Sequence, residues 1–170
     1  MAGSHDSGYW AAERYRDRLY SDLRDGAIAG LLGGGSIMVL SLLYDALLFT
    51  PLATPDFLAQ ALIGRAGLAA DITTQLRLVR IAMFTVLHLA AFIFLGIVLV
   101  KFFRITNIRK TLLHGGLYGL TACTTLFGAS LQLSGTKVSV APEWLAVLLG
   151  NFIAGVVMAG YLQTRTPQQE

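Results

Sequence analysis

The stretch from Gly26 to Pro51, GAIAGLLGGGSIMVLSLLYDALLFTP, decides the fold of this chain. The eighteen residues between Gly26 and Asp45 carry no charged side chain. A helix over residues 26–49 rises about 36 Å, which is enough to cross a hydrocarbon core of about 30 Å. Gly26, Gly30 and Gly34 recur every fourth residue and share one helix face, where another backbone can approach closely. The stretch therefore predicts a membrane span with a flat face for a neighbouring helix.

Three further apolar segments make four spans in all, at about residues 26–49, 78–103, 111–131 and 143–162. The chain is 55% hydrophobic and only 14% charged, whereas about 25% of the residues of soluble domains are charged. We expect an all-α fold, a four-transmembrane-helix bundle over residues 26–162, followed by a polar tail at residues 163–170. Small residues recur at Gly115, Gly119 and Gly155. These glycines favour packing between the four helices, with docking on a partner protein or pigment as the alternative.

The N-terminal segment, residues 1–25, is expected to contain an amphipathic helix over residues 9–25. Ala12, Tyr15, Leu19 and Leu23 fall on one stripe, and four arginines alternate with four acidic residues around it. The pattern is typical of a helix that lies on the membrane surface or docks on a partner. A solvated helix next to the membrane remains an alternative interpretation.

A second short helix is expected after the first span. Thr54 can cap a helix whose first residue is Pro55 and which stops near Gly64. Such a helix is too short to cross the bilayer, so the sequence predicts an interfacial or re-entrant element.

The distribution of basic residues predicts the orientation of the spans. Nine of the thirteen lysine and arginine residues fall on the side that holds both termini and the loop at residues 101–110. The other four are Arg65, Arg77, Arg80 and Lys137. By the positive-inside rule, both termini of this multi-pass protein are expected in the cytoplasm.

Asp45 is the most informative single residue, because a carboxylate near lipid is costly unless it is paired. Arg77 and Arg80 begin the second span from the same side of the membrane. We expect Asp45 to form an intramembrane ion pair with Arg77 or Arg80. The pair is interpreted as a link between the first two spans, with proton or ion handling as the alternative.

His88 and His114 are the two histidines that a haem or chlorin could use as ligands. In antiparallel spans they lie at depths that differ by about 15 Å, which excludes one haem shared between them. We therefore expect no bound cofactor and no metal, and we keep each histidine as a possible single ligand. Contact with lipid or pigment remains open.

The motifs of common enzymes do not occur. The chain has no HExxH, GxSxG or Walker sequence. Its basic residues are spread over loops and form no single patch, which argues against binding to nucleic acid. The sequence favours a protein that is not an enzyme.

The run from Gly26 to Gly64 resembles a group of small, uncharacterised bacterial four-helix membrane proteins. The likeness rests on the glycine-rich first helix ending in Tyr44-Asp45, on Pro51-Leu52-Ala53-Thr54-Pro55, and on His88 to Phe92 with Gly96. The resemblance implies four spans in a bacterial cytoplasmic (inner) membrane and carries no activity. In its small size and its lack of catalytic motifs, the chain is also similar to accessory subunits of respiratory or photosynthetic complexes.

Three functional hypotheses follow from the sequence. The first is a non-catalytic accessory or scaffold subunit that stabilises a larger membrane complex of the respiratory or photosynthetic type, with lipid and other membrane subunits as its partners. The second is a small transporter or channel that works through Asp45, Arg77 and Arg80. The third is a pigment or haem carrier.

Overall fold

The computed structural model describes residues 6–48, 50–63, 74–106, 112–133 and 141–165, which are almost entirely helical and include no strand. Three helices are long: α1 (Asp6–Leu47), α3 (Thr74–Thr106) and α6 (Ala141–Thr164). The shorter elements are α2 (Ala53–Ile63), α4 (Leu112–Tyr118), the π-helix η1 (Gly119–Cys123) and α5 (Thr124–Leu133). The predicted all-α class is confirmed. The predicted end of the short helix near Gly64 lies outside the described residues. So do residues 166–170 of the predicted polar tail.

Within the described residues, three helices are long and apolar enough to cross a membrane. The stretches concerned are Ala12–Leu47, Arg77–Phe103 and Leu145–Thr164. The fourth predicted span, residues 111–131, corresponds to α4, η1 and α5, which follow one another without a break from Leu112 to Leu133. The π-helical turn in the middle divides this run into three short elements. The run is helical as predicted, and its crossing of the membrane stays a prediction.

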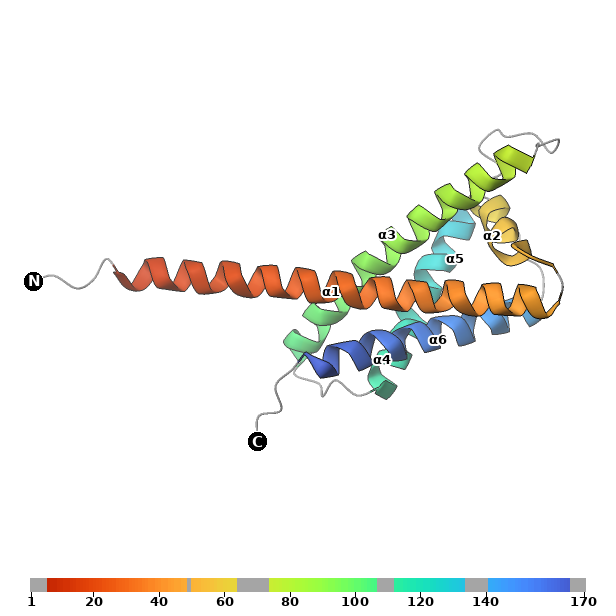
Figure 1. The fold of residues 1–170 in the computed structure, drawn as a ribbon. Coiled ribbons are helices and arrows are strands. Elements are labelled where there is room, and N and C mark those ends of the chain that lie inside the picture. The colour runs from red at the N-terminus through yellow and green to blue at the C-terminus, as the bar shows by residue number, and fades with distance from the viewer. Residues whose placement is uncertain (1–5, 49, 64–73, 107–111, 134–140, 166–170) are drawn as a thin grey trace, which may run out of the picture.

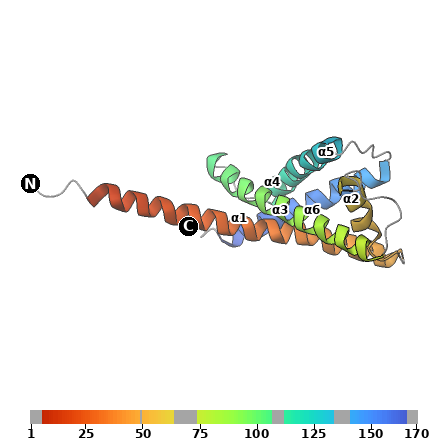
Figure 2. The ribbon, with the colours of Figure 1, turned by 90° about the horizontal axis from the view of Figure 1, so that it is seen from above.

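The helices form a splayed bundle in which the chain direction alternates (Figures 1 and 2). Helix α1 packs against α3 and α6, and α4 packs against α6. The fully buried side chains at the centre of the bundle include Leu99, Met158 and Leu162. The α4–η1–α5 run packs on α3 near Tyr118 and η1, and an open groove lies between these two parts of the bundle.

Helix α1 is one continuous helix of 42 residues, about 63 Å long. The structure has no break near Gly26, where the sequence suggested a boundary between an interfacial helix and the first span. Residues 9–25 therefore do not form a separate element, and their part of α1 projects beyond the rest of the bundle (Figure 1). A straight helix that crosses the membrane must carry this part away from the membrane plane.

The glycines of the first span lie where α1 crosses α3. A Cβ placed on Gly26 would lie 2.6 Å from the Cα of Ile97, and one on Gly96 would lie 2.6 Å from the backbone nitrogen of Gly30. Gly34 is less tight, because its Cβ would lie 3.0 Å from the Cβ of Phe92. The two backbones touch directly at this crossing, which no larger residue would allow.

The second set of glycines lies where α4 and η1 cross α6. A Cβ on Gly115 would fall against Ala159 and the backbone of Gly155, and one on Gly155 would lie 2.9 Å from the Cα of Gly119. All six glycines that the sequence singled out therefore contact helices of the same chain. These contacts are those expected of packing between the helices of one chain. Gly35, by contrast, has nothing within 4 Å of its Cβ position.

Candidate functional site

Asp45 lies at the C-terminal end of α1 and is 2% exposed. Its Oδ2 accepts a hydrogen bond from the backbone N–H of Thr54 (2.9 Å), and its Oδ1 accepts one from the Thr54 hydroxyl (2.6 Å). Thr54 is in the first turn of α2, where backbone N–H groups have no partner within the helix. Asp45 thus caps α2, and a carboxylate at this end also interacts favourably with the helix dipole. The prediction that Thr54 caps its own helix is wrong.

A tight turn brings Asp45 back onto α2. The N–H of Thr50 donates to the carbonyl of Asp45 (2.9 Å), and that of Ala53 donates to the carbonyl of Thr50 (3.1 Å). Leu52 has a φ of 63°, a left-handed conformation that costs about 1 kcal/mol or more for a residue with a Cβ. The hydrogen bonds of Asp45 offset this cost, so the aspartate holds the turn and the start of α2 together.

The two arginines of α3 bind a different aspartate. The Nε of Arg77 lies 3.0 Å from Oδ2 of Asp56, and a terminal nitrogen of Arg80 donates to Oδ1 of Asp56 over 2.6 Å. The side-chain amide of Gln60 also donates to Asp56 (3.2 Å). The prediction that Arg77 or Arg80 pairs with Asp45 is therefore wrong, because both arginines pair with Asp56. The physical reason is that α2 packs on α3 and places Asp56 over the arginines, while Asp45 is occupied by Thr54.

The Asp56 cluster, defined as Asp56, Arg77 and Arg80, is layered from the surface inwards. The side chain of Arg77 is 41% exposed, that of Asp56 14% and that of Arg80 8%. The Nε atoms of both arginines are buried, and neither makes a hydrogen bond of acceptable geometry. Two guanidinium groups therefore share one carboxylate, and part of their hydrogen-bonding capacity is unused.

The contact between Asp45 and Thr54 can be measured by a double-mutant cycle. We expect Asp45→Ala to lower the free energy of unfolding by about 1–2 kcal/mol, because α2 loses its cap. Combined with Thr54→Val, which removes the hydroxyl, the two losses should be less than additive by about 1 kcal/mol. Thr121→Val is the matched control, since the Thr121 hydroxyl bonds only to the backbone of its own helix segment. Additive losses for Asp45→Ala and Thr54→Val would contradict the cap.

His88 lies on α3 between two aromatic rings. Its ring centroid is 5.6 Å from that of Phe84 and 4.8 Å from that of Phe92, and the ring lies close to the backbone of Gly34 on α1. Its Nε2 is buried without a hydrogen-bond partner.

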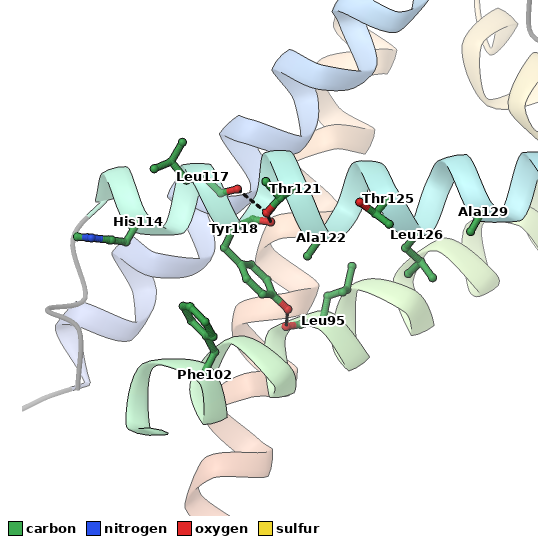
Figure 3. A pocket seen from close by; sticks show the side chains of 10 residues that line it. All are labelled: Leu95, Phe102, His114, Leu117, Tyr118, Thr121, Ala122, Thr125, Leu126 and Ala129. Carbon is green, nitrogen blue, oxygen red and sulfur yellow. Dashed lines mark hydrogen bonds between the residues drawn. The ribbon is translucent and has the colours of Figure 1, made fainter. Parts of the chain in front are cut away.

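His114 lies in a separate groove between α3 and the α4–η1–α5 run (Figure 3). The groove has a volume of about 720 Å³ and is open along one side. Its lining is mostly apolar, and the Tyr118 hydroxyl donates to the carbonyl of Leu95 across its inner wall (2.8 Å). The lining residues are Leu95, Phe102, His114, Leu117, Tyr118, Thr121, Ala122, Thr125, Leu126 and Ala129. Among the described residues no three histidine, cysteine or acidic side chains come together as a metal site.

The sequence pattern did not predict one polar contact inside the bundle, which joins α5 and α6. Asn151 is 6% exposed in the middle of α6, and its Nδ2 donates to the hydroxyl of Thr124 over 3.0 Å. Hydrogen bonds of this kind between helices in lipid contribute about 0.6–2 kcal/mol each. The signal in the sequence that could have predicted this contact is an asparagine within an otherwise apolar span. The contact lies beside the Gly119–Gly155 crossing and helps to stabilise the packing of α6 against the α4–η1–α5 run.

No known relative bears on the geometry of these clusters. Comparison with family models, with curated proteins and with solved structures finds no match to this chain.

Proposed function

We propose that this chain is a four-span membrane protein that serves as a non-catalytic accessory subunit of a larger membrane complex. The proposal includes the α4–η1–α5 run as the fourth span. Its 22 residues from Leu112 to Leu133 correspond to about 33 Å of helix, and it packs on α6 through Gly115 and Gly119. Four spans place both termini on one side, which the positive-inside rule assigns to the cytoplasm of a bacterial inner membrane protein.

The observation that carries the proposal is the projecting part of α1. The side chains of Tyr15, Leu19 and Leu23 are 71%, 37% and 39% exposed. At 100° per residue they fall on the same face of α1 as Gly26 and Gly30, which pack against α3. The face that builds the bundle therefore continues along the part of α1 that projects beyond the bundle (Figure 1).

An exposed apolar stripe of this kind needs a partner in water. If the apolar part of α1 crosses the membrane, about twenty residues extend on the cytoplasmic side, roughly 30 Å beyond the lipid. Exposed aromatic and aliphatic side chains that continue a packed face mark a protein interaction site. A helix of another subunit can lie along this stripe and extend the packing of α3 and α6, which suits an accessory subunit of a respiratory or photosynthetic type of complex.

The stripe can be tested by co-purification. We expect the double variant Tyr15→Ser and Leu19→Ser to lose its partner subunit on extraction in a mild detergent, while its thermal stability stays within a few degrees of the wild type. Neither side chain contributes to the core, so the bundle should fold normally. Asp17→Ser is the control, because Asp17 is exposed on the opposite face of the same helix. Isolation of the wild type as a clean monomer would contradict the proposal.

The transporter hypothesis needs a functional carboxylate, and Asp45→Asn distinguishes it from the accessory role. The structure uses Asp45 as a cap for α2 and separates it from the hydrogen bonds of the arginines. An accessory subunit with this substitution should lose stability or assembly only. A transporter reconstituted in vesicles should lose its flux of protons or ions.

A further inference from the structure

The Asp56 cluster has more positive charge than its acidic partner can satisfy. Both oxygens of Asp56 already accept contacts from Arg77, Arg80 and Gln60. Asp45, another carboxylate close to the start of α2, has both oxygens engaged by Thr54. Among the described residues, the Nε atoms of both guanidinium groups are buried without a hydrogen-bond partner.

The unused donor lies deep in the cluster. The Nε of Arg80 is buried with no hydrogen-bond partner, in a side chain that is only 8% exposed. A buried donor without an acceptor is costly, and more so when its group is charged. Arg77, whose side chain is 41% exposed, lies at the open side of the cluster, so an acceptor from outside the chain meets Arg77 first.

The position of the cluster in the membrane indicates what that acceptor is. Arg77 is the first residue of the apolar stretch Arg77–Phe103, and a helix of that length and composition reaches from one edge of the hydrocarbon core to the other. Arg77 therefore lies at the depth of the lipid headgroups, and Arg80 lies one turn deeper. Phosphate oxygens of phospholipids are the acceptors present at that depth, and a guanidinium group binds phosphate with two parallel hydrogen bonds.

We propose that the Asp56 cluster is a binding site for the phosphate of an anionic phospholipid. Arg77 binds the phosphate at the surface, and the positive charge of Arg80 below it adds to the attraction. Asp56 orients both arginines and leaves one net positive charge, which favours an anionic headgroup over a zwitterionic one. The bound lipid fills the angle between α2 and α3, which pack together here. The proposal is independent of the accessory role.

The experiment uses the purified full chain, stripped of lipid in detergent. Phosphatidylglycerol, phosphatidylcholine and inorganic phosphate are added separately, and binding is measured by native mass spectrometry and by the thermal shift. We expect one tightly bound phosphatidylglycerol, with at least about tenfold weaker binding of phosphatidylcholine, because its choline cation is repelled by the net positive charge of the cluster. Inorganic phosphate should bind weakly, because it lacks acyl chains to lie along α2 and α3. An equal thermal shift with inorganic phosphate alone would overturn the assignment to a lipid.

Two variants on the same helix decide the location of the site. Arg77→Gln should remove the preference for phosphatidylglycerol, and its fold should persist because Arg80 still pairs with Asp56. Lys101→Gln removes one exposed positive charge from the other end of α3 and should keep the preference. Circular dichroism verifies that both variants are folded. Unchanged binding in Arg77→Gln, or equal losses in the two variants, would overturn the proposal.

Discussion

Replacing Gly96 with leucine is expected to separate α1 from α3 and to destabilise the bundle by about 3 kcal/mol or more. The Cβ of any residue at this position would fall against the carbonyl of Gly26 and the backbone nitrogen of Gly30. These are backbone atoms of another helix, which cannot move aside as the end of a flexible side chain can. Thermal denaturation in detergent, followed by circular dichroism, should show a much lower midpoint or no cooperative transition.

Gly35→Leu is the matched control for this prediction. Gly35 lies in the same glycine-rich run of α1, but a Cβ there meets nothing within 4 Å. Leucine favours the helical conformation by up to about 1 kcal/mol relative to glycine, so the control should be unchanged or slightly more stable. Equal stability of the Gly96→Leu and Gly35→Leu variants would show that the α1–α3 crossing is not as close as the structure indicates.

Asp56→Ala is expected to have the second large effect, with a loss of about 3 kcal/mol in the free energy of unfolding. The substitution leaves Arg77 and Arg80 without a carboxylate, and the side chain of Arg80 is buried. An uncompensated buried charge costs more than the intact pair contributes. The measurement is denaturation of the purified protein in detergent micelles of a neutral, lipid-free composition.

Rescue by a second substitution separates charge burial from lost packing. In the Asp56→Ala background, Arg80→Met should restore a large part of the stability, because the unpaired charge is removed while the chain length is kept. Glu13→Ala is the control for loss of an exposed pair, since Glu13 lies 4.0 Å from Arg16 and their side chains are 35% and 76% exposed. That control should cost at most about 1 kcal/mol. Failure of Arg80→Met to restore stability would contradict the role assigned to Asp56.

The positions of the glycine crossings could be anticipated from the sequence. Gly26 and Gly30, four residues apart in an apolar run, must lie on one helix face, and lipid offers no other force as strong as close packing to hold helices together. Which helix would meet them could not be known. Gly96 faces Gly26 and Gly30 because α3 crosses α1 obliquely, and that angle depends on the whole set of helix contacts.

The continuity of α1 was not predictable from its local sequence. The change from a charged to an uncharged segment at Gly26 favoured a boundary there, and glycines at positions 26, 30 and 33–35 lower the intrinsic helix propensity. In the structure, α3 and α6 pack over this part of α1 and offset that weakness. The π-helical turn of η1 has a similar origin, because it lies where Gly119 meets the backbone of Asn151 and Gly155 on α6.

The sequence by itself determined the helical class, the apolar segments and the small residues at which helices meet, because these depend on side-chain polarity and size along one helix. Only the tertiary structure decided the partners of the charged residues. Asp45 and Asp56 are both near the start of α2, and either could have met Arg77 and Arg80. The rotation of α2 on α3 assigns Asp56 to the arginines, and the turn at Leu52 returns Asp45 to Thr54. A hydrogen bond depends on distances of a few tenths of an ångström, which follow from packing in three dimensions and not from spacing along the chain.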